Sequence, residues 1–170
     1  SRPTDAWRFF EIDPVVVRIA RDPKRFSFLS RCRPGADIVL GDARLTLAKE
    51  PSSKFDYLVI DAFSSDSVPV HLLTVEALRL YLDKLAPEGL LALHISNRHL
   101  DLIGVVGAIT RAVPGIHAKL ADDKIKSEGF DAAQSHVVFV SHSSAPLERL
   151  SKLPFMLELP NDGVKPWTDD

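Results

Sequence analysis

Short apolar runs alternate with amphipathic segments along this chain, and the alternation predicts strands and helices in turn. The run 57–60 is continuously apolar, which is typical of a strand buried on both faces. Between residues 74 and 85, apolar residues recur at helical spacing. Such repeated βα units predict an α/β fold with a Rossmann-like, mostly parallel sheet that has helices on both faces. The predicted strands cover 7–11, 37–40, 55–60, 90–95, 116–120 and 136–140, and the last two are expected to be antiparallel.

Capping residues mark where the helices should begin. Asp13 followed by Pro14 is a favourable N-cap and first helical residue. After the second strand, Gly41 makes a turn and Asp42 can cap the next helix. Asn97 can cap a later one. The predicted helices cover about 15–20, 42–49, 74–85 and 97–113.

Composition and charge narrow the class of protein. The 170 residues, 45% of them apolar, fit a single globular domain over 1–170. Cys32 is the only cysteine, which excludes an internal disulfide and a thiolate-rich zinc site and fits a reducing compartment. A net charge of −2 gives no basic footprint for nucleic acid. No signal peptide or membrane span is visible, and the start at Ser1 without Met leads us to expect a fragment of a longer protein.

Three carboxylates follow successive predicted strands: Glu11, Asp42 and Asp61. Because the carboxyl ends of parallel strands meet at one edge, where α/β folds bind ligands, we expect these acids to lie together. Asp42 has an equally good explanation as a helix cap. Glu11 has no such capping role, and its carboxylate can accept hydrogen bonds from both hydroxyls of a ribose. Asp61 follows an apolar run that predicts a dry setting, where a carboxylate usually serves a function.

The remaining polar residues indicate neither a metal site nor a serine nucleophile. His94 lies inside a predicted strand and is interpreted as a hydrogen-bonded core residue, while four other histidines lack metal-ligand spacing, so no metal is predicted. No GxSxG motif is present. Gly104 and Gly107 fall within an apolar helical pattern, where close helix packing explains them better than phosphate binding.

Five segments resemble, in order, the nucleotide-binding core of the spermidine synthase (polyamine aminopropyltransferase) family: FFEIDPVVVRIA, GDARLTLAK, FDYLVIDAFSSDSVPVHLLT, TVEALRLYLDKL and GLLALHISN. The likeness is closest to bacterial spermidine synthase-like proteins, some of which are joined to a membrane-embedded region. It covers residues 7–97 well and the remainder loosely, and the terminal WTDD is similar to a segment of that subgroup. The resemblance implies a class I methyltransferase-type sheet. The family's glycine-rich first strand is missing before Trp7, so a sheet without its first strand is expected.

The resemblance also implies roles for the acids. Glu11 matches the acid that holds the ribose hydroxyls of the S-adenosyl donor, and Asp42 with Ala43 matches the adenine-contacting pair. Asp61 matches the acid that opens the catalytic segment, which would orient the attacking amine and help remove its proton. Asp66 would match the second amine-contacting acid, but the sequence DAFSSD displaces it by two residues from the family's compact DSSD pattern.

The implied reaction is transfer of an aminopropyl group from decarboxylated S-adenosylmethionine to a polyamine or other amine, without a metal, as in polyamine biosynthesis. Whether this fragment is active without the glycine-rich loop stays open. Two alternatives also stay open: a methyltransferase that uses S-adenosylmethionine, and a non-catalytic adenosyl-binding domain of a membrane-linked protein. Besides the amine, the expected partners are a second copy in a homodimer and a membrane-embedded region of the parent protein. The expected location is the cytoplasm, either free or as a cytoplasmic domain.

Overall fold

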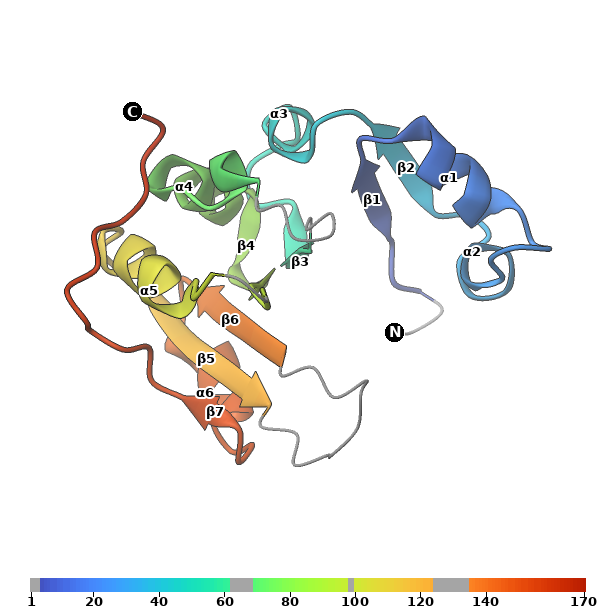
Figure 1. The fold of residues 1–170 in the computed structure, drawn as a ribbon. Helices are drawn as coiled ribbons and strands as arrows, with labels where there is room; N and C mark the ends of the chain where they lie inside the picture. Colours follow the sequence, from blue (N-terminus) through green and yellow to red (C-terminus); the bar gives the residue numbers. More distant parts are fainter. Residues whose placement is uncertain (1–3, 62–68, 98–99, 124–134) are drawn as a thin grey trace. The chain divides into compact units, whose positions relative to one another are not determined.

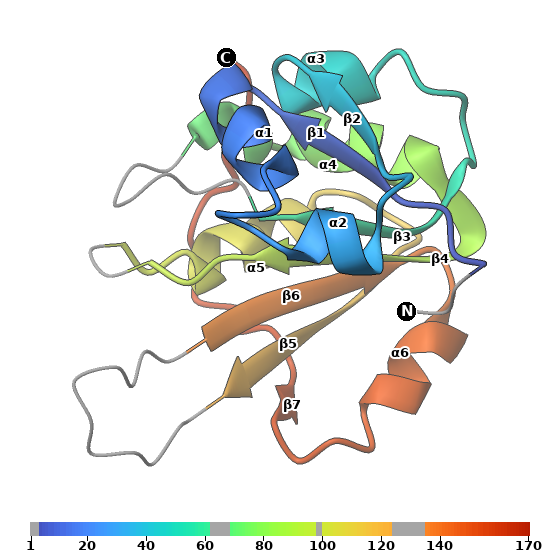
Figure 2. The same ribbon diagram turned by 90° about the vertical axis from the view of Figure 1, so that its right-hand side faces the viewer.

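A computed structural model describes residues 4–61, 69–97, 100–123 and 135–170 (Figures 1 and 2). The chain divides into two compact units, Ser1–Glu50 and Pro51–Asp170, and each is described by itself. Within the described residues, no helix combines the length and the apolar character that crossing a membrane requires.

The first unit is a parallel strand pair with three short helices, and two of its helix caps are those that the sequence predicts. The Asp13 side chain accepts a hydrogen bond from the N–H of Val15 at 2.7 Å, and a proline begins that helix. The Asp42 side chain accepts one from the N–H of Leu45 at 2.8 Å, although its helix ends before the predicted residue 49. The elements are β1 (Arg8–Glu11), α1 (Pro14–Arg21), α2 (Phe28–Cys32), β2 (Asp37–Leu40) and α3 (Ala43–Leu47).

Arg8 links β1 to two other parts of the first unit. Its guanidinium contacts Asp37 at the start of β2 and Glu50 after α3, each at 2.5 Å. Burial lowers the pKa of Arg8, but the hydrogen bonds and charges of these two carboxylates outweigh it and leave the pKa raised. Because a two-stranded sheet is marginal by itself, these ion pairs help to hold β1 in register with β2.

The second unit contains a five-stranded sheet in the order β3-β4-β6-β5-β7. Strands β3 and β4 are parallel and the other adjacent pairs are antiparallel, so the predicted antiparallel late strands are confirmed. Helices flank this sheet (Figure 1). The elements are β3 (Phe55–Ile60), the short 3-10 helix η1 (Val70–Leu72), α4 (Val75–Lys84), β4 (Leu85–His94), α5 (Ile103–Arg111), β5 (His117–Asp123), β6 (Ser135–Ser141), α6 (Ser144–Leu150) and β7 (Met156–Leu157).

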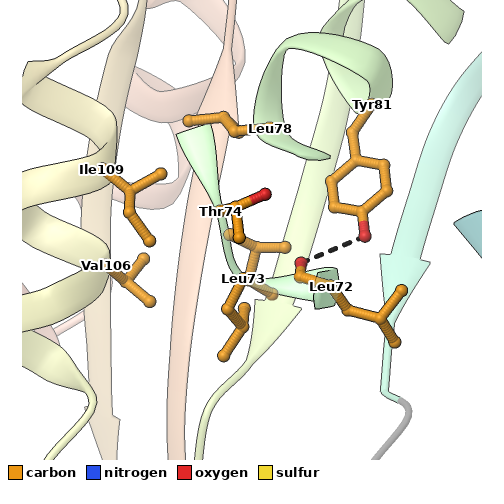
Figure 3. A pocket seen from close by; sticks show the side chains of 8 residues that line it. Leu72, Leu73, Thr74, Leu78, Tyr81, Val106 and Ile109 are labelled. Atoms are coloured by element: carbon orange, nitrogen blue, oxygen red, sulfur yellow. Dashed lines mark hydrogen bonds between the residues drawn. The ribbon is translucent and has the colours of Figure 1, made fainter. Parts of the chain in front are cut away.

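The core of the second unit lies between its sheet and the helices α4 and α5. Leu78 and Tyr81 of α4 and Val106 and Ile109 of α5 are each at most 2% exposed. They line a small pocket in which the Tyr81 hydroxyl donates a hydrogen bond to the carbonyl oxygen of Leu72 at 3.0 Å (Figure 3). Since the lining is mainly apolar and the hydroxyls of Tyr81 and Thr74 both have partners, the pocket is part of the packed core.

Strand β3 has its predicted bounds but not its predicted burial. Only Leu58 is buried, while Tyr57 and Val59 on the other face are 50% and 47% exposed. The prediction of a strand buried on both faces is therefore wrong. The physical reason is that β3 is the edge strand of the five-stranded sheet, and the face that carries Tyr57 and Val59 is only partly covered.

Strand β4 begins earlier than the predicted residue 90. Leu85 already pairs with Phe55 of β3, and the register then shifts before regular pairing resumes. Gly89 permits this irregular stretch, because a Cβ there would lie 2.9 Å from the main-chain oxygens of both Ala86 and Phe55.

The helix predicted from Asn97 begins later, at Ile103. The Asn97 side chain instead accepts a hydrogen bond from the N–H of Leu100 at 2.9 Å. In the first turn of α5, the N–H of Ile103 donates a hydrogen bond to the side chain of Asp101 at 3.0 Å. Asn97 therefore accepts a local main-chain hydrogen bond instead of capping α5.

The two glycines of α5 face the C-terminal segment, not a second helix as the sequence analysis favoured. A Cβ at Gly104 would collide with the carboxylate of Asp162, and one at Gly107 would lie 3.1 Å from the carbonyl oxygen of Pro160. Arg111 at the end of α5 donates a hydrogen bond to the same Pro160 carbonyl at 2.6 Å. In Figure 1 this red segment runs beside α5 toward the start of α4.

Candidate functional site

The first unit places two predicted site residues at the same end of its strand pair. Glu11 is the last residue of β1, and its carbonyl accepts a hydrogen bond from the N–H of Gly41 at 3.0 Å. Asp42 follows Gly41 directly. Gly41 has a φ of +136°, and a Cβ there would lie 3.0 Å from Cγ2 of Thr46, so glycine makes this tight turn possible.

The Glu11 carboxylate can still bind a ligand. Its Oε1 accepts the N–H of Asp13 at 2.9 Å, which holds the side chain near the start of α1. A carboxylate has about four lone-pair positions on its two oxygens, so Glu11 retains acceptor capacity for a diol.

Asp42 acts as a helix cap in this structure. Its Oδ1 accepts the N–H of Leu45, and its main-chain oxygen accepts both the N–H and the hydroxyl of Thr46. Ala43 is the first residue of the capped helix α3. The cap explanation is confirmed, and the adenine contact that the resemblance implies for Asp42 and Ala43 stays a prediction.

The second unit joins Asp61 to a residue that the sequence analysis did not assign to the site. Asp61 directly follows β3, and His94 is the last residue of β4. Because Ile60 pairs with Leu93 in the parallel register, the next residue of each strand comes side by side. Oδ1 of Asp61 lies 2.7 Å from Nδ1 of His94.

Both side chains of this pair reach solvent, with exposed fractions of 62% for Asp61 and 34% for His94. The dry setting predicted for Asp61 is therefore wrong, because β3 is an edge strand. For His94 the predicted hydrogen bond is confirmed, but the core position is wrong. The sequence does contain a signal for this pair: Asp61 and His94 are polar residues that each follow a run of apolar strand residues. A parallel register of the two strands brings such residues together.

A second Asp–His pair lies at this end of the sheet. His136 of β6 and Asp122 of β5 are opposite each other, with Nε2 and Oδ1 3.4 Å apart. The His136 carbonyl accepts the N–H of Ile95, just after β4. Among the described residues, no group of three or more His, Cys, Asp or Glu side chains could hold a metal ion. Asp66, the predicted second amine-contacting acid, lies outside the described residues.

This architecture is an α/β fold of the class I methyltransferase-like type, and solved structures of two activities share it. A probable spermidine synthase from Corynebacterium glutamicum matches with a TM-score of 0.65 and 19% identity, over 96% of this chain and 63% of that chain. The spermidine synthase from Thermotoga maritima matches with a TM-score of 0.61 and 20% identity, over 96% of this chain and 54% of that chain. Human methyltransferase-like protein 13, solved in complex with SAH, matches with a TM-score of 0.58 and 20% identity, over 98% of this chain and 76% of that chain.

These similarities establish the fold but not the reaction, because the identities are 19–20%. This chain spans less than two-thirds of the length of either spermidine synthase. No family model and no curated protein sequence matches it.

Proposed function

We propose that this chain is the donor-binding part of a spermidine synthase-like enzyme, which transfers an aminopropyl group from decarboxylated S-adenosylmethionine to an amine. The observation that carries the proposal is Asp61, a hydrogen-bonded and solvent-accessible carboxylate at the carboxyl end of β3. It opens the segment DAFSSDSVP, which resembles the family's catalytic segment. The carboxyl ends of parallel strands are the usual ligand edge of such folds.

In this proposal the first unit binds the adenosyl part of the donor. Glu11 accepts hydrogen bonds from the ribose hydroxyls. Its hydrogen bond from the N–H of Asp13 uses one of the acceptor positions of the carboxylate, and the others are available for the diol. Asp42 and Ala43, at the start of α3, contact the adenine. The complex of methyltransferase-like protein 13 with SAH, on a similar fold, supports an adenosyl-type ligand.

The reaction needs a carboxylate where the amine binds, because the protonated amine and the sulfonium of the donor are both cations and must come close together. The attacking amine loses a proton, its nitrogen forms a bond to the aminopropyl carbon, and the bond from that carbon to sulfur breaks. The electron pair of the broken bond stays on sulfur, so methylthioadenosine leaves without charge. Asp61 attracts and orients the amine and offsets its repulsion from the sulfonium.

A second candidate is a methyltransferase that uses S-adenosylmethionine itself. The observation that favours it is the match to methyltransferase-like protein 13, at a TM-score of 0.58 and over 76% of that chain. The two reactions transfer different groups from the sulfur of the donor. Aminopropyl transfer leaves methylthioadenosine, and methyl transfer leaves S-adenosylhomocysteine.

The test incubates the whole protein that contains this chain with a panel of diamines and polyamines and with either donor, and identifies the products by mass spectrometry. Methylthioadenosine together with an amine heavier by one aminopropyl group, lost in Asp61→Asn, is the expected result. S-adenosylhomocysteine with a methylated product would establish the methyltransferase instead. Binding of both donors without any product would overturn both enzyme functions and leave an adenosyl-binding domain.

A further inference from the structure

We propose that Asp61 and His94 act as one proton-accepting unit, in which His94 takes the proton that the amine loses while Asp61 holds the imidazole. The inference rests on the proposed function and adds a second residue to its chemistry. It is carried by the 2.7 Å contact between Oδ1 of Asp61 and Nδ1 of His94, at the adjacent ends of β3 and β4.

The geometry sets the direction of the hydrogen bond. An ionised Asp61 only accepts, so the Nδ1–H of His94 donates to it. With the proton on Nδ1, the acceptor nitrogen of the neutral ring is Nε2. The carboxylate thus fixes one tautomer and stabilises the imidazolium that forms when Nε2 takes a proton, as in other Asp–His pairs. The ring is 34% exposed, so it is accessible from the solvent side.

Imidazole suits this task better than a carboxylate does. An ordinary aspartate has a pKa near 4 and an ordinary histidine one near 6.5, about the range in which general bases work at neutral pH. The ammonium form of the amine gives its proton to Nε2, and its freed electron pair then forms the bond to carbon. The proton ends on the imidazolium, which is paired with the Asp61 carboxylate, and later passes to water.

On the strands at this end of the sheet, the other ionisable groups described are His136 of β6 and Asp122 and Asp123 of β5. His136 and Asp122 face each other across the antiparallel register, and Asp123 is opposite Ser135. His94 itself is opposite Val137 of β6. The Asp61 carboxylate is in direct contact with the His94 ring.

The decisive variant is His94→Asn. An Asn amide nitrogen occupies about the place of Nδ1, so it keeps the donor to Asp61 but cannot take up a proton. If His94 accepts the proton, we expect kcat to fall by roughly 10²- to 10⁴-fold while the KM for the donor changes little. Raising the pH should recover part of the loss, because more of the amine is then already deprotonated and needs no base. Wild-type kcat in His94→Asn would show that His94 only positions Asp61, and would overturn the proposal.

A matched control removes a different imidazole. Nε2 of His142 contacts the carbonyl of Leu82 at 3.0 Å, and this residue follows β6 at the end of the sheet opposite to His94. His142→Gln keeps a donor at about the Nε2 position and should leave kcat and the pH profile unchanged. If kcat fell as much in His142→Gln as in His94→Asn, both losses would reflect general destabilisation, and this result would contradict the proposal.

A second measurement separates the pair from the reaction. ¹⁵N NMR of the histidine rings in this chain shows, without any substrate, which ring nitrogen of His94 carries the proton. The paired carboxylate should hold the Nδ1–H tautomer in the wild type, and Asp61→Asn should lose this preference because its amide can also donate a hydrogen bond to Nδ1. The same tautomer in both proteins would overturn the unit. The expected change of tautomer together with no transfer to any amine would overturn the proposed function and the role of His94 in it. Transfer that survives in His94→Asn would overturn this inference alone.

Discussion

The hydroxyl of Thr74 donates a hydrogen bond to Oδ1 of Asp169 at 2.9 Å, so the second-last residue of the chain is tied to the start of α4. The same hydroxyl accepts the N–H of Ala77 and caps the helix. The N–H of Val75 donates to the carbonyl oxygen of Trp167 at 3.0 Å. The terminal WTDD segment therefore supplies part of the N-terminal cap of α4, whose first N–H groups would otherwise lack partners.

Asp169→Ala should lower the free energy of unfolding by about 1–2 kcal/mol, because it removes the acceptor of a hydroxyl on the buried Thr74. For a chain of this size that corresponds to a Tm lower by roughly 2–8 °C. Urea denaturation of the variant measures the change. Asp170→Ala alters the neighbouring carboxylate and should have almost no effect. Equal losses in both variants would contradict a specific role for Asp169.

A second prediction concerns the contact between α5 and the C-terminal segment. By helix propensity alone, Gly104→Ala should stabilise α5 by about 1 kcal/mol. The new Cβ meets the carboxylate of Asp162 and lies 3.2 Å from Cγ2 of Val164, so we expect no net gain in the single variant. Combining it with Asp162→Ala should recover most of the gain, as thermal denaturation of the single and double variants would report.

Gly107→Ala is the matched control for that pair. Its Cβ would lie 3.1 Å from the main-chain oxygen of Pro160, which Asp162→Ala does not remove. The double variant Gly107→Ala with Asp162→Ala should therefore gain nothing. If Gly104→Ala alone is more stable than the wild type by the full amount, the C-terminal segment does not pack tightly on α5.

Local signals in the sequence predicted much of the fold. Asp13 and Asp42 bond to N–H groups two and three residues further on, so the cap and its partner are visible in one short window. Strands β2 and β3 have their predicted bounds for the same reason, since a run of apolar residues between turn residues is a local pattern.

The features that the sequence analysis missed depend on distant residues. Gly104 and Asp162 meet across nearly sixty residues, and nothing near either one indicates the other. The exposure of Tyr57 depends on which strand lies at the edge of the sheet. The Asp61–His94 pair depends on the register of β3 and β4, which periodicity alone does not give.

A third prediction follows from the charge pair at the end of α4. Lys84 Nζ lies 2.9 Å from Oδ2 of Asp83, and the hydroxyl of Ser52 donates to the same carboxylate. The hydrogen bond from Lys84, and after it that from Ser52, lowers the pKa of Asp83 below its usual value. Since the folded pKa is lowered, the stabilisation is complete above the ordinary pKa of about 4 and is lost as pH falls through the folded value.

Asp83→Asn should therefore cost stability at pH 7 and much less near pH 3. We expect about 1 kcal/mol at pH 7, a modest value because the Asp83 side chain is half exposed although Lys84 is buried. Denaturation of the wild type and the variant across this pH range gives the difference. Ser52→Ala should reproduce a smaller part of the loss. A difference that stays constant with pH would show that the charge of Asp83 is not its cause.

The fourth prediction tests the proposed donor site in the first unit. Glu11→Gln keeps the size of the side chain but replaces one carboxylate oxygen by an amide group that cannot accept hydrogen bonds, so a bound diol loses a charged acceptor. Such bonds contribute about 1.5–3 kcal/mol, so the affinity for S-adenosyl ligands should fall by roughly 10- to 150-fold, as measured by calorimetry on the whole protein. Asp13→Asn is the control, because Asn caps a helix as well as Asp does and Asp13 contacts Glu11 only through its N–H. Unchanged affinity in Glu11→Gln would mean that the ribose does not bind at the end of β1.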